Sequence, residues 1–345
     1  MQQNTGDILQ FNARPNFTQR LWNQAEPNSG DAYASFLLGG IEGSSNYPVF
    51  PFFRQWYLAP FFQDDWKISR RVTLNLGLRW DLNYFPDEKY NRLNRGFNPD
   101  LASPIAQLIP ANMLAMYPQL QNLKGGLEFT GVNGNPSTVG KLDKNNFQPR
   151  VGVAFQITDR TVLRGGYGLY NLNPNNDWNN TIGFSTSTQL VNSSDSGRTL
   201  LPNLLSNPFP SINQPVGSSI GPLTFAGNNF NWFNPNMYTP YVHQFSFGIQ
   251  RQLSNNSSLD FSYVGSRTIG ANTERDFNIP SADFRKRCNL LEGGSPTFCN
   301  EQVPNPFQGI GAFRGTTYFT APNISRYNLN RPFPQFSGNL LEGTQ

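Results

Sequence analysis

The sequence is poor in the side chains that most catalytic and metal sites require. Its 345 residues contain one histidine, His243, and two cysteines, Cys288 and Cys299. A histidine-based triad or a zinc site needs more of these side chains than the chain supplies. We therefore expect no catalytic residues, no metal site and no cofactor. Carboxylates remain as the candidates for acid–base chemistry.

Charge and long apolar runs are also scarce. Charged residues make up 14% of the chain, against roughly 25% in an ordinary soluble domain. No stretch approaches the roughly 18 apolar residues of a transmembrane helix, and Met1-Gln2-Gln3-Asn4 lacks the basic and apolar regions of a signal peptide. The net charge is +4, but Arg285-Lys286-Arg287 is the only tight basic cluster. We therefore expect no nucleic-acid partner.

Glycine, proline and aromatic residues are abundant instead. The chain has 31 Gly, 27 Pro and 29 Phe, and 14% of its residues are aromatic. Helices use these residue types least, whereas strands favour aromatics and turns favour Gly, Pro and Asn. The composition excludes a helix bundle and predicts an all-β fold.

The clearest predicted strand runs from Val72 to Tyr84. Every even position is apolar, and the positions between carry Thr73, Asn75, Gly77, Arg79, Asp81 and Asn83. This period of two is the pattern of a β-strand with one apolar face. About 13 residues at roughly 3.3 Å each, tilted near 45°, would rise about 30 Å, the thickness of a bilayer core.

Comparable alternation predicts three hairpins, at about 55–84, 147–170 and 241–265. Their turns are Ser69-Arg70-Arg71, Thr158-Asp159-Arg160 and Ser254-Asn255-Asn256. Long loops rich in Asn, Pro, Gly and Ser follow them, at about 85–146, 171–240 and 266–345. Because alternate connections of an up-and-down sheet lie at opposite ends, all short turns share one end and all long loops the other.

That asymmetry is typical of outer-membrane β-barrels, which have short periplasmic turns and long extracellular loops. The competing interpretation is a soluble β-sandwich or propeller. Sandwich strands are shorter, and turns come every 8 to 12 residues or so. Structureless loops of this length would also be unusual in a compact soluble domain. The pattern therefore favours an antiparallel up-and-down transmembrane barrel of about seven or eight strands, which is incomplete.

Three longer stretches resemble the barrel of TonB-dependent outer-membrane receptors, and specifically the Oar-like branch that carries a carboxypeptidase regulatory-like domain. Residues 61–82, FFQDDWKISRRVTLNLGLRWDL, resemble its QDDWK-like segment and the alternating strand that follows. Residues 146–170, NFQPRVGVAFQITDRTVLRGGYGLY, and 240–265, PYVHQFSFGIQRQLSNNSSLDFSYVG, resemble its next two hairpins. Shorter matches, in the same order as in that branch, are GDAYASFLLG at 30–39, VPNPFQGI at 303–310 and NRPFPQF at 330–336. The motif residues are Gln63, Asp64, Asp65, Trp66, Lys67, Asn75, Gly77, Arg79, Pro149, Arg150, Arg164, Gly165, Gly166, Tyr167 and Gly168.

The resemblance implies a location, partners and a role. The chain would lie in the cell outer membrane of a Gram-negative-type bacterium, in contact with outer-membrane lipid. It would bind an unknown extracellular ligand and be coupled to the TonB complex through a plug domain. Compared with the family, we expect residues 1–345 to include no signal peptide, regulatory-like domain, TonB box, plug or terminal aromatic strand. Since outer-membrane transporters have about 22 strands, we interpret residues 1–345 as an internal part of such a barrel.

Several candidate sites have plainer interpretations. Asp64 and Asp65 could form a carboxylate pair, but adjacent strand residues point to opposite faces. Arg79, Arg150 and Arg164 occupy polar-face positions, where they could be solvated or could contact an anionic ligand or the plug. Gly165, Gly166 and Gly168 lack the following helix of a phosphate loop and fit strand glycines. His243 has no partner His or Cys, so we expect a structural role.

Aromatic residues gather near the predicted strand ends, as in the interface girdles of barrels, although a sandwich core is the alternative. They are Trp56, Tyr57, Trp66, Trp80, Tyr84, Tyr167, Tyr170 and Tyr241. In the last long loop, Cys288 and Cys299 are expected to form a disulfide, because a cell-surface loop is in an oxidising compartment.

The sequence thus predicts part of a receptor barrel for TonB-dependent uptake of an unidentified nutrient, without covalent chemistry of its own. The alternative is a secreted β-rich adhesion or carbohydrate-binding module. A glycoside hydrolase with a carboxylate pair has only compositional support.

Overall fold

The computed structural model describes residues 8–21, 28–172, 181–193, 199–202 and 205–344. Met1–Asn4 and part of the 171–240 loop lie outside these residues. The chain divides into two compact units. The first contains residues 1–51 and 181–220, and the second contains residues 52–180 and 221–345.

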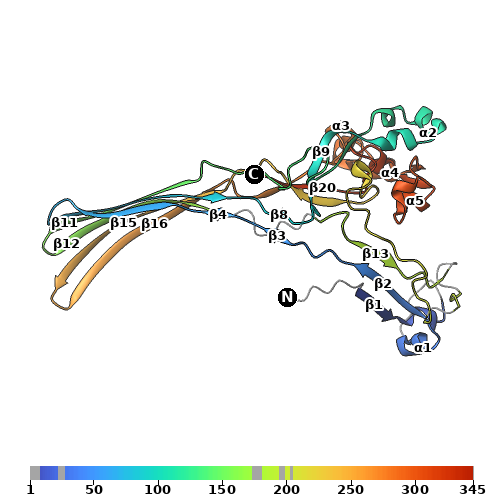
Figure 1. Cartoon of the computed structure of the whole chain (residues 1–345), viewed down its shortest axis with the longest axis horizontal. Helices are drawn as coiled ribbons and strands as arrows, with labels where there is room; N and C mark the ends of the chain where they lie inside the picture. Colours follow the sequence, from blue (N-terminus) through green and yellow to red (C-terminus); the bar gives the residue numbers. More distant parts are fainter. Residues whose placement is uncertain (1–7, 22–27, 173–180, 194–198, 203–204, 345) are drawn as a thin grey trace. The chain divides into compact units, whose positions relative to one another are not determined.

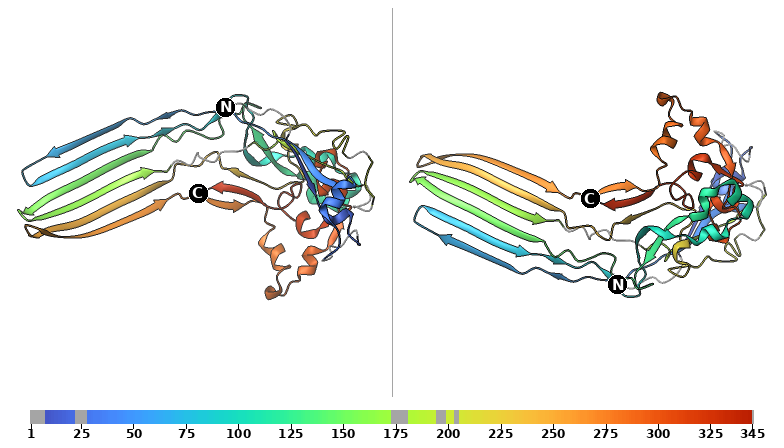
Figure 2. Two further views of the ribbon diagram at one scale, coloured as in Figure 1. Left: turned by 90° about the horizontal axis from the view of Figure 1, so that it is seen from below. Right: turned by 90° about the horizontal axis from the view of Figure 1, so that it is seen from above.

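The second unit contains a six-stranded antiparallel sheet in which strands that follow one another in the sequence lie side by side (Figures 1 and 2). Its order is β16-β15-β12-β11-β6-β5. The strands are β5 (Phe61–Lys67), β6 (Val72–Trp80), β11 (Phe147–Thr158), β12 (Thr161–Asn171), β15 (Tyr241–Ser254) and β16 (Ser257–Ile269). This is the predicted all-β, up-and-down meander, but with six strands rather than seven or eight.

The three predicted turns join these strands in pairs at one end of the sheet. Thr158 pairs with Thr161 and Ser254 with Ser257, so each of these hairpins turns over two residues. In the first hairpin the Ser69 hydroxyl accepts hydrogen bonds from the amides of Arg71 (3.2 Å) and Val72 (3.1 Å). A serine that bonds forward to its own backbone is a common way to close a turn.

The strand expected to extend from Val72 to Tyr84 ends earlier, at Trp80. Its continuation, β7 (Leu82–Asn83), pairs with β4 (Tyr57–Leu58) instead of the main sheet. Asp81 separates the two: its amide donates to the Asn146 carbonyl, and its carboxylate accepts from Arg79 and Gln148. The polar position therefore redirects the chain although the alternation of the sequence continues.

The long connections are folded, which corrects the expectation of structureless loops. Short strand pairs form between β9 (Asn94–Ala102) and β10 (Lys124–Phe129), β18 (Gln302–Pro304) and β19 (Asn323–Ser325), and β3 (Phe53–Arg54) and β8 (Asp87–Glu88). A three-stranded sheet joins β14 (Phe230–Phe233), β20 (Leu340–Thr344) and β17 (Thr273–Asp276). The short helices are α2 (Ala111–Met116), α3 (Ala282–Lys286), α4 (Pro296–Asn300), α5 (Thr317–Thr320) and α6 (Arg326–Leu329), with 3-10 turns η2 (Pro104–Leu108), η3 (Pro118–Asn122), η5 (Gly221–Leu223), η6 (Leu290–Glu292) and η7 (Gly311–Phe313).

The core of the second unit lies in these connections rather than in the sheet. Residues of the first and last long segments pack together in one cluster, which includes Ile105, Leu120, Phe307, Phe313 and Tyr318. A second group is aromatic: Phe97 lies 4.8 Å from Phe333 and 5.2 Å from Trp232, and Phe230 lies 5.3 Å from Phe336, between ring centroids. These aromatic residues therefore build a core within the connections, apart from the strand-end aromatics. The motifs VPNPFQGI and NRPFPQF supply the buried Phe307 and Phe336.

The first unit is small. It contains β1 (Ile8–Ala13), η1 (Pro15–Phe17), α1 (Ala32–Leu37), β2 (Ile41–Tyr47) and β13 (Thr186–Gln189), with strand order β1-β2-β13. Asp31 caps α1 by accepting a hydrogen bond from the Ala34 amide at 2.7 Å. Ile41 and Leu190 form its small buried core. The sequence pattern had not indicated this unit.

No helix among the described residues is long and apolar enough to cross a membrane.

Candidate functional site

The strand register divides the six-stranded sheet into an apolar and a polar face. Directly paired residues point to the same face, and the pairs Val153↔Leu74, Gly165↔Val153 and Phe247↔Gly165 continue across β6, β11, β12 and β15. The apolar face carries Phe62, Trp66, Leu74, Leu76, Leu78, Val151, Val153, Phe155, Leu163, Phe245, Phe247, Ile249, Phe261 and Tyr263.

The side chains of the apolar face are open to the surroundings. Phe62 is 67% exposed, Phe247 55% and Phe261 66%. Water-soluble proteins rarely leave contiguous apolar patches of more than a few hundred Å² uncovered, and this face extends over six strands. Hydrocarbon is the solvent that such a face suits.

The two carboxylates of the QDDWK-like motif lie on different faces. Asp64 pairs with Leu76 on the apolar face, and Asp65 pairs with Asn75 on the polar face. The Asn75 amide donates a hydrogen bond to Asp65. The expectation that these two side chains point to opposite faces is confirmed.

The polar face is hollowed by two adjoining recesses of about 370 and 420 Å³ that share Arg150. The floor of the first is made of glycines, namely Gly77, Gly152, Gly166 and Gly168. Gly152 and Gly166 are direct partners, and Asn75 and Ser246 flank them in the same cross-strand row. A run of residues without large side chains therefore opens the middle of this face.

Arg79 is held in place in the second recess. Its Nε donates to the Asp81 carboxylate at 2.7 Å, and its Nη2 donates to the Tyr57 hydroxyl. The other carboxylate oxygen of Asp81 accepts from the Gln148 amide. Four side chains from β4, β6, β11 and the segment after β6 thus form one hydrogen-bonded group.

Arg150 is positioned by an aromatic ring instead of a carboxylate. Its guanidinium carbon lies 4.7 Å from the centre of the Tyr170 ring, a cation–π arrangement. The ring itself lies over Gly168: a Cβ placed there would approach Tyr170 Cε2 to 2.7 Å. Gly168 therefore leaves the space that Tyr170 occupies. Tyr170 borders the first recess and Tyr57 the second, so the expectation that they form part of a lipid-facing girdle is wrong.

Arg164 is exposed on the same face, between Ala154 and Gly248 in its cross-strand row. Within the described residues, no ion pair or hydrogen bond of its side chain is found. Arg79, Arg150 and Arg164 thus share the polar face, as expected. Together with the amides of Gln63 and Gln244 in the first recess, they provide cationic and neutral hydrogen-bonding groups for a bound molecule.

The folded connections hold one strongly perturbed acid, Glu88. It is 1% exposed and accepts hydrogen bonds from the amides of Phe52 (3.0 Å), Tyr90 (2.8 Å) and Arg92 (2.9 Å) and from the Arg92 guanidinium (2.7 Å). Burial alone would raise the pKa of this carboxyl, but these donors outweigh it and lower the pKa to about 2. Because every donor is a neighbour in the fold, Glu88 stabilises the β3–β8 junction.

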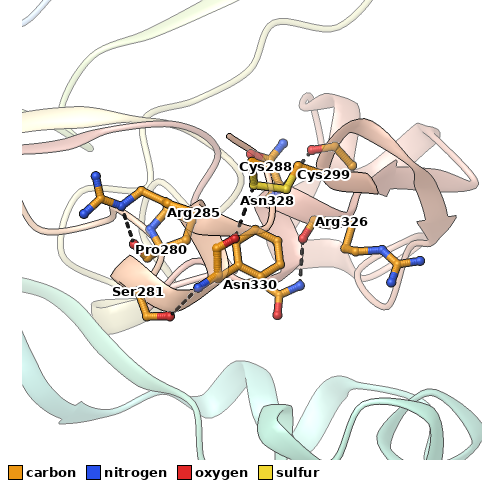
Figure 3. The surroundings of a disulfide bond; sticks show 10 residues. Pro280, Ser281, Arg285, Cys288, Cys299, Arg326, Asn328 and Asn330 are labelled. Carbon is orange, nitrogen blue, oxygen red and sulfur yellow. Dashed lines mark hydrogen bonds between the residues drawn. A yellow bond between two sulfur atoms is a disulfide. The ribbon is translucent and has the colours of Figure 1, made fainter. Parts of the chain in front are cut away.

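Cys288 and Cys299 are joined in a disulfide with their Cα atoms 5.6 Å apart (Figure 3). Nearby, Arg285 Nε donates to the Pro280 carbonyl at 3.1 Å, and the Asn330 amide donates to the Arg326 carbonyl at 2.8 Å. The guanidinium carbons of Arg287 and Arg326 lie 4.0 and 4.4 Å from the centre of the Phe298 ring. No group of three or more potential metal-ligating His, Cys, Asp or Glu is found in the part of the chain that the structure describes.

A long antiparallel meander with one open apolar face and one polar face defines a membrane-spanning β-protein. A family model described as "Outer membrane beta barrel domain" matches residues 1–341. The chain belongs to this family and is an outer-membrane protein of a Gram-negative bacterium. No significant match is found among curated proteins or among solved structures.

Sequence reasoning missed how the recess residues are connected. The sequence analysis had placed Asp81 in an alternating pattern, Gln148 within the 146–170 stretch and Tyr170 among the strand-end aromatics. One usable signal was present in Gly168 and Tyr170, since a glycine two positions before an aromatic on the same face leaves room for the ring. No signal in the sequence indicated the hydrogen bond between Gln148 and Asp81, because the two residues are 67 positions apart.

Proposed function

We propose that the chain is part of the barrel wall of a TonB-dependent outer-membrane receptor of the Oar-like branch. In this role it takes part in the uptake of a scarce nutrient and performs no covalent chemistry. Its partners are outer-membrane lipid, an extracellular ligand and, through a plug domain of the full receptor, the TonB complex. Nucleic acid is not among them.

The observation that carries the proposal is the polar face with its two recesses. A wall that only had to separate lipid from water would need no pre-positioned side chains there. This face instead holds Arg79 by Asp81 and Tyr57, and Arg150 by Tyr170. Ordered cationic groups over a glycine floor suit a passing or docked polar molecule, because their positions need no rearrangement on binding.

The folded connections support a capture role. Receptors place variable binding residues on loops supported by a rigid scaffold. Here the first and last long segments share a core, and buried Gln335 donates to the carbonyl of Lys124 at 2.7 Å across them. The family assignment favours this outer-membrane receptor over a secreted module.

The test compares strains of the bacterium that carries the gene: wild type, a receptor deletion and a TonB deletion. Each is grown on single sources of iron, peptide or glycan. We expect at least one source to support only the wild type, with uptake restored by the intact gene. Complementation with Arg150→Ala should restore no more than about one tenth of the wild-type uptake rate. This corresponds to a loss of about 1.4 kcal/mol in the free energy of binding.

Arg71→Ala is the matched control, since Arg71 is an exposed residue of a short turn. It should restore uptake fully. A receptor deletion that loses no TonB-dependent source would overturn the proposal. If Arg150→Ala and Arg71→Ala had equal effects on uptake, the polar face would have no part in the proposed function.

A further inference from the structure

The apolar face of the sheet ends in two polar side chains that lie opposite one another. His243 on β15 pairs with Arg267 on β16. Both stand on the apolar face, since the pairs Phe245↔Gly265 and Phe247↔Tyr263 continue the same alternation towards the short turns. The register of the two strands is regular from Tyr241 to Gln252, so no bulge moves them to the other face.

His243 is oriented by two tyrosines. Its Nδ1 lies 2.8 Å from the Tyr167 hydroxyl of β12, and the Tyr241 ring meets the imidazole edge-on at 5.4 Å between centroids. When the tyrosine hydroxyl donates to Nδ1, the imidazole proton is on Nε2. The His243 imidazole then presents an Nε2–H donor in a fixed orientation.

Arg267 is exposed, and no ion pair or hydrogen bond of its side chain is found within the described residues. Directly opposite side chains of an antiparallel pair have Cβ atoms about 5 Å apart. The guanidinium fork and the imidazole can therefore reach one group together. A guanidinium prefers a carboxylate or phosphate, which it binds through two parallel hydrogen bonds.

The position of the pair along the strands matches a membrane boundary. Near the short turns the apolar face carries another cation, Arg251, which pairs with Leu259. Eight residue steps separate Arg251 from His243. At roughly 3.3 Å per residue and a tilt of about 40°, they span about 20 Å, close to the apolar band of an outer-membrane barrel. Because short turns face the periplasm in such barrels, the His243–Arg267 pair lies at the outer boundary.

An apolar wall lies directly below the pair. A Cβ at Gly265 would meet the Phe245 ring at 2.5 Å, so this ring lies against the glycine, and Phe245 and Tyr263 are 6.1 Å apart between centroids. A ligand at this position therefore meets donors and positive charge above and aromatic surface below. That combination fits an amphiphile with an anionic head.

We propose that His243, Arg267 and Tyr167 form a binding site for the phosphate group of an anionic lipid in the outer leaflet. Arg267 binds two phosphate oxygens, His243 donates from Nε2, and Tyr167 holds the imidazole in position. The acyl chains lie along Phe245 and Tyr263. The site is on the lipid-facing side of the sheet, so its failure would leave the function proposed for the polar face untouched.

The experiment titrates the full chain in detergent micelles with lipid A carrying two phosphates and with chemically dephosphorylated lipid A, and counts bound lipid by native mass spectrometry. We expect the phosphorylated form to bind at least about tenfold more tightly. Arg267→Gln should remove this difference, and Arg267→Lys should keep part of it, since lysine retains the charge but not the fork. Tyr167→Phe should weaken binding several-fold while leaving every charge in place.

Arg164→Gln is the matched control, because it removes the same charge from the polar face. It should change affinity less than about twofold. Far-UV circular dichroism checks that each variant keeps its β-structure. Equal binding of both lipids, or an equal loss in Arg164→Gln and Arg267→Gln, would overturn the site, and displacement of the lipid by inorganic phosphate alone would show a site for soluble anions instead.

Discussion

At the scale of single residues, polar side chains in this protein are held by a few exact neighbours. Arg79 depends on Asp81 and Tyr57, Arg150 on the Tyr170 ring, and Glu88 on three amides and one guanidinium. Of these, Glu88 is the buried charge and the costliest to disturb, because a buried charge that loses its partners keeps its desolvation penalty.

Glu88 makes the β3–β8 junction sensitive to acid. Its pKa is lowered from 4.5 to about 2 in the folded protein, so its contribution to stability is complete above about pH 4.5 and is lost as the pH falls towards 2. At pH 3 we expect a loss of roughly 2 kcal/mol. Hydrogen exchange of the Phe52, Tyr90 and Arg92 amides, corrected for intrinsic rates, should show about 30-fold less protection at pH 3 than at pH 6.

Glu88→Gln should lower the same protection at pH 6 and make it nearly independent of pH between 3 and 6. Asp100→Asn is the control, since the Asp100 side chain is 87% exposed and its nearest cation, Lys124, is 3.8 Å away. Unchanged protection of the three amides at pH 3 would contradict the role given to the carboxylate.

At the scale of elements, each strand of the sheet presents two environments that alternate residue by residue. Leu76 and Asn75 are neighbours on β6, yet Leu76 pairs with Asp64 and Val151 on the apolar face, while Asn75 pairs with Asp65 and Gly152 on the polar face. In the middle of the apolar face, charge costs far more than it does on the polar face.

Leu74→Arg, in the middle of the apolar face between Trp66 and Val153, should therefore destabilise the folded sheet in lipid vesicles by about 2–4 kcal/mol, whereas Asn75→Arg should cost less than about 1 kcal/mol. Urea titrations followed by tryptophan fluorescence measure both. The two variants add the same side chain one position apart, so each controls for the other. Equal destabilisation would mean that the two faces are in the same solvent.

The disulfide stabilises a short element of the last long segment. Closing the loop between Cys288 and Cys299 restricts the unfolded segment by about 3 kcal/mol in the chain-entropy account. Reduction should expose the backbone around Arg285, Lys286 and Arg287 to trypsin. Cys288→Ser combined with Cys299→Ser should reproduce the cleavage without reductant, and cleavage at Lys141 and Lys144 should not change. Equal trypsin resistance before and after reduction would argue against a stabilising role.

At the scale of the whole molecule, the sheet and the folded connections rely on different forces. The sheet buries little side-chain surface of its own and needs lipid against its apolar face. The connections bury Phe307, Phe313 and Phe336 without it. When the protein is extracted from the membrane, we therefore expect the sheet to unfold before the folded connections do.

The described sheet has two end strands, β5 and β16, each paired with one neighbour in it. An open edge leaves backbone groups without partners, and each costs several kcal/mol in hydrocarbon. We expect this chain alone not to form a closed, conducting barrel. Planar-bilayer recordings should show no stable conductance, and migration on unheated gels should match heated samples. Discrete channels from the purified chain would show this to be wrong.

The sequence by itself determined the three hairpins, their short turns and the division of the sheet into two faces. These properties follow from a period of two and from turn residues, which depend only on neighbours along the chain. Arg79, Arg150 and Arg164 could be placed on the polar face for the same reason. The same period of two placed Asp64 and Asp65 on opposite faces of the strand.

Only the tertiary structure decided what the long connections do and how the polar face is organised. The aromatic core joins Phe97, Phe230 and Phe336, and the recess joins Asp81 to Gln148; these contacts cross tens to hundreds of residues. Asp81 also ends β6 where the alternation continues. Such contacts depend on which distant surfaces fit together, and a local pattern carries no information about that fit.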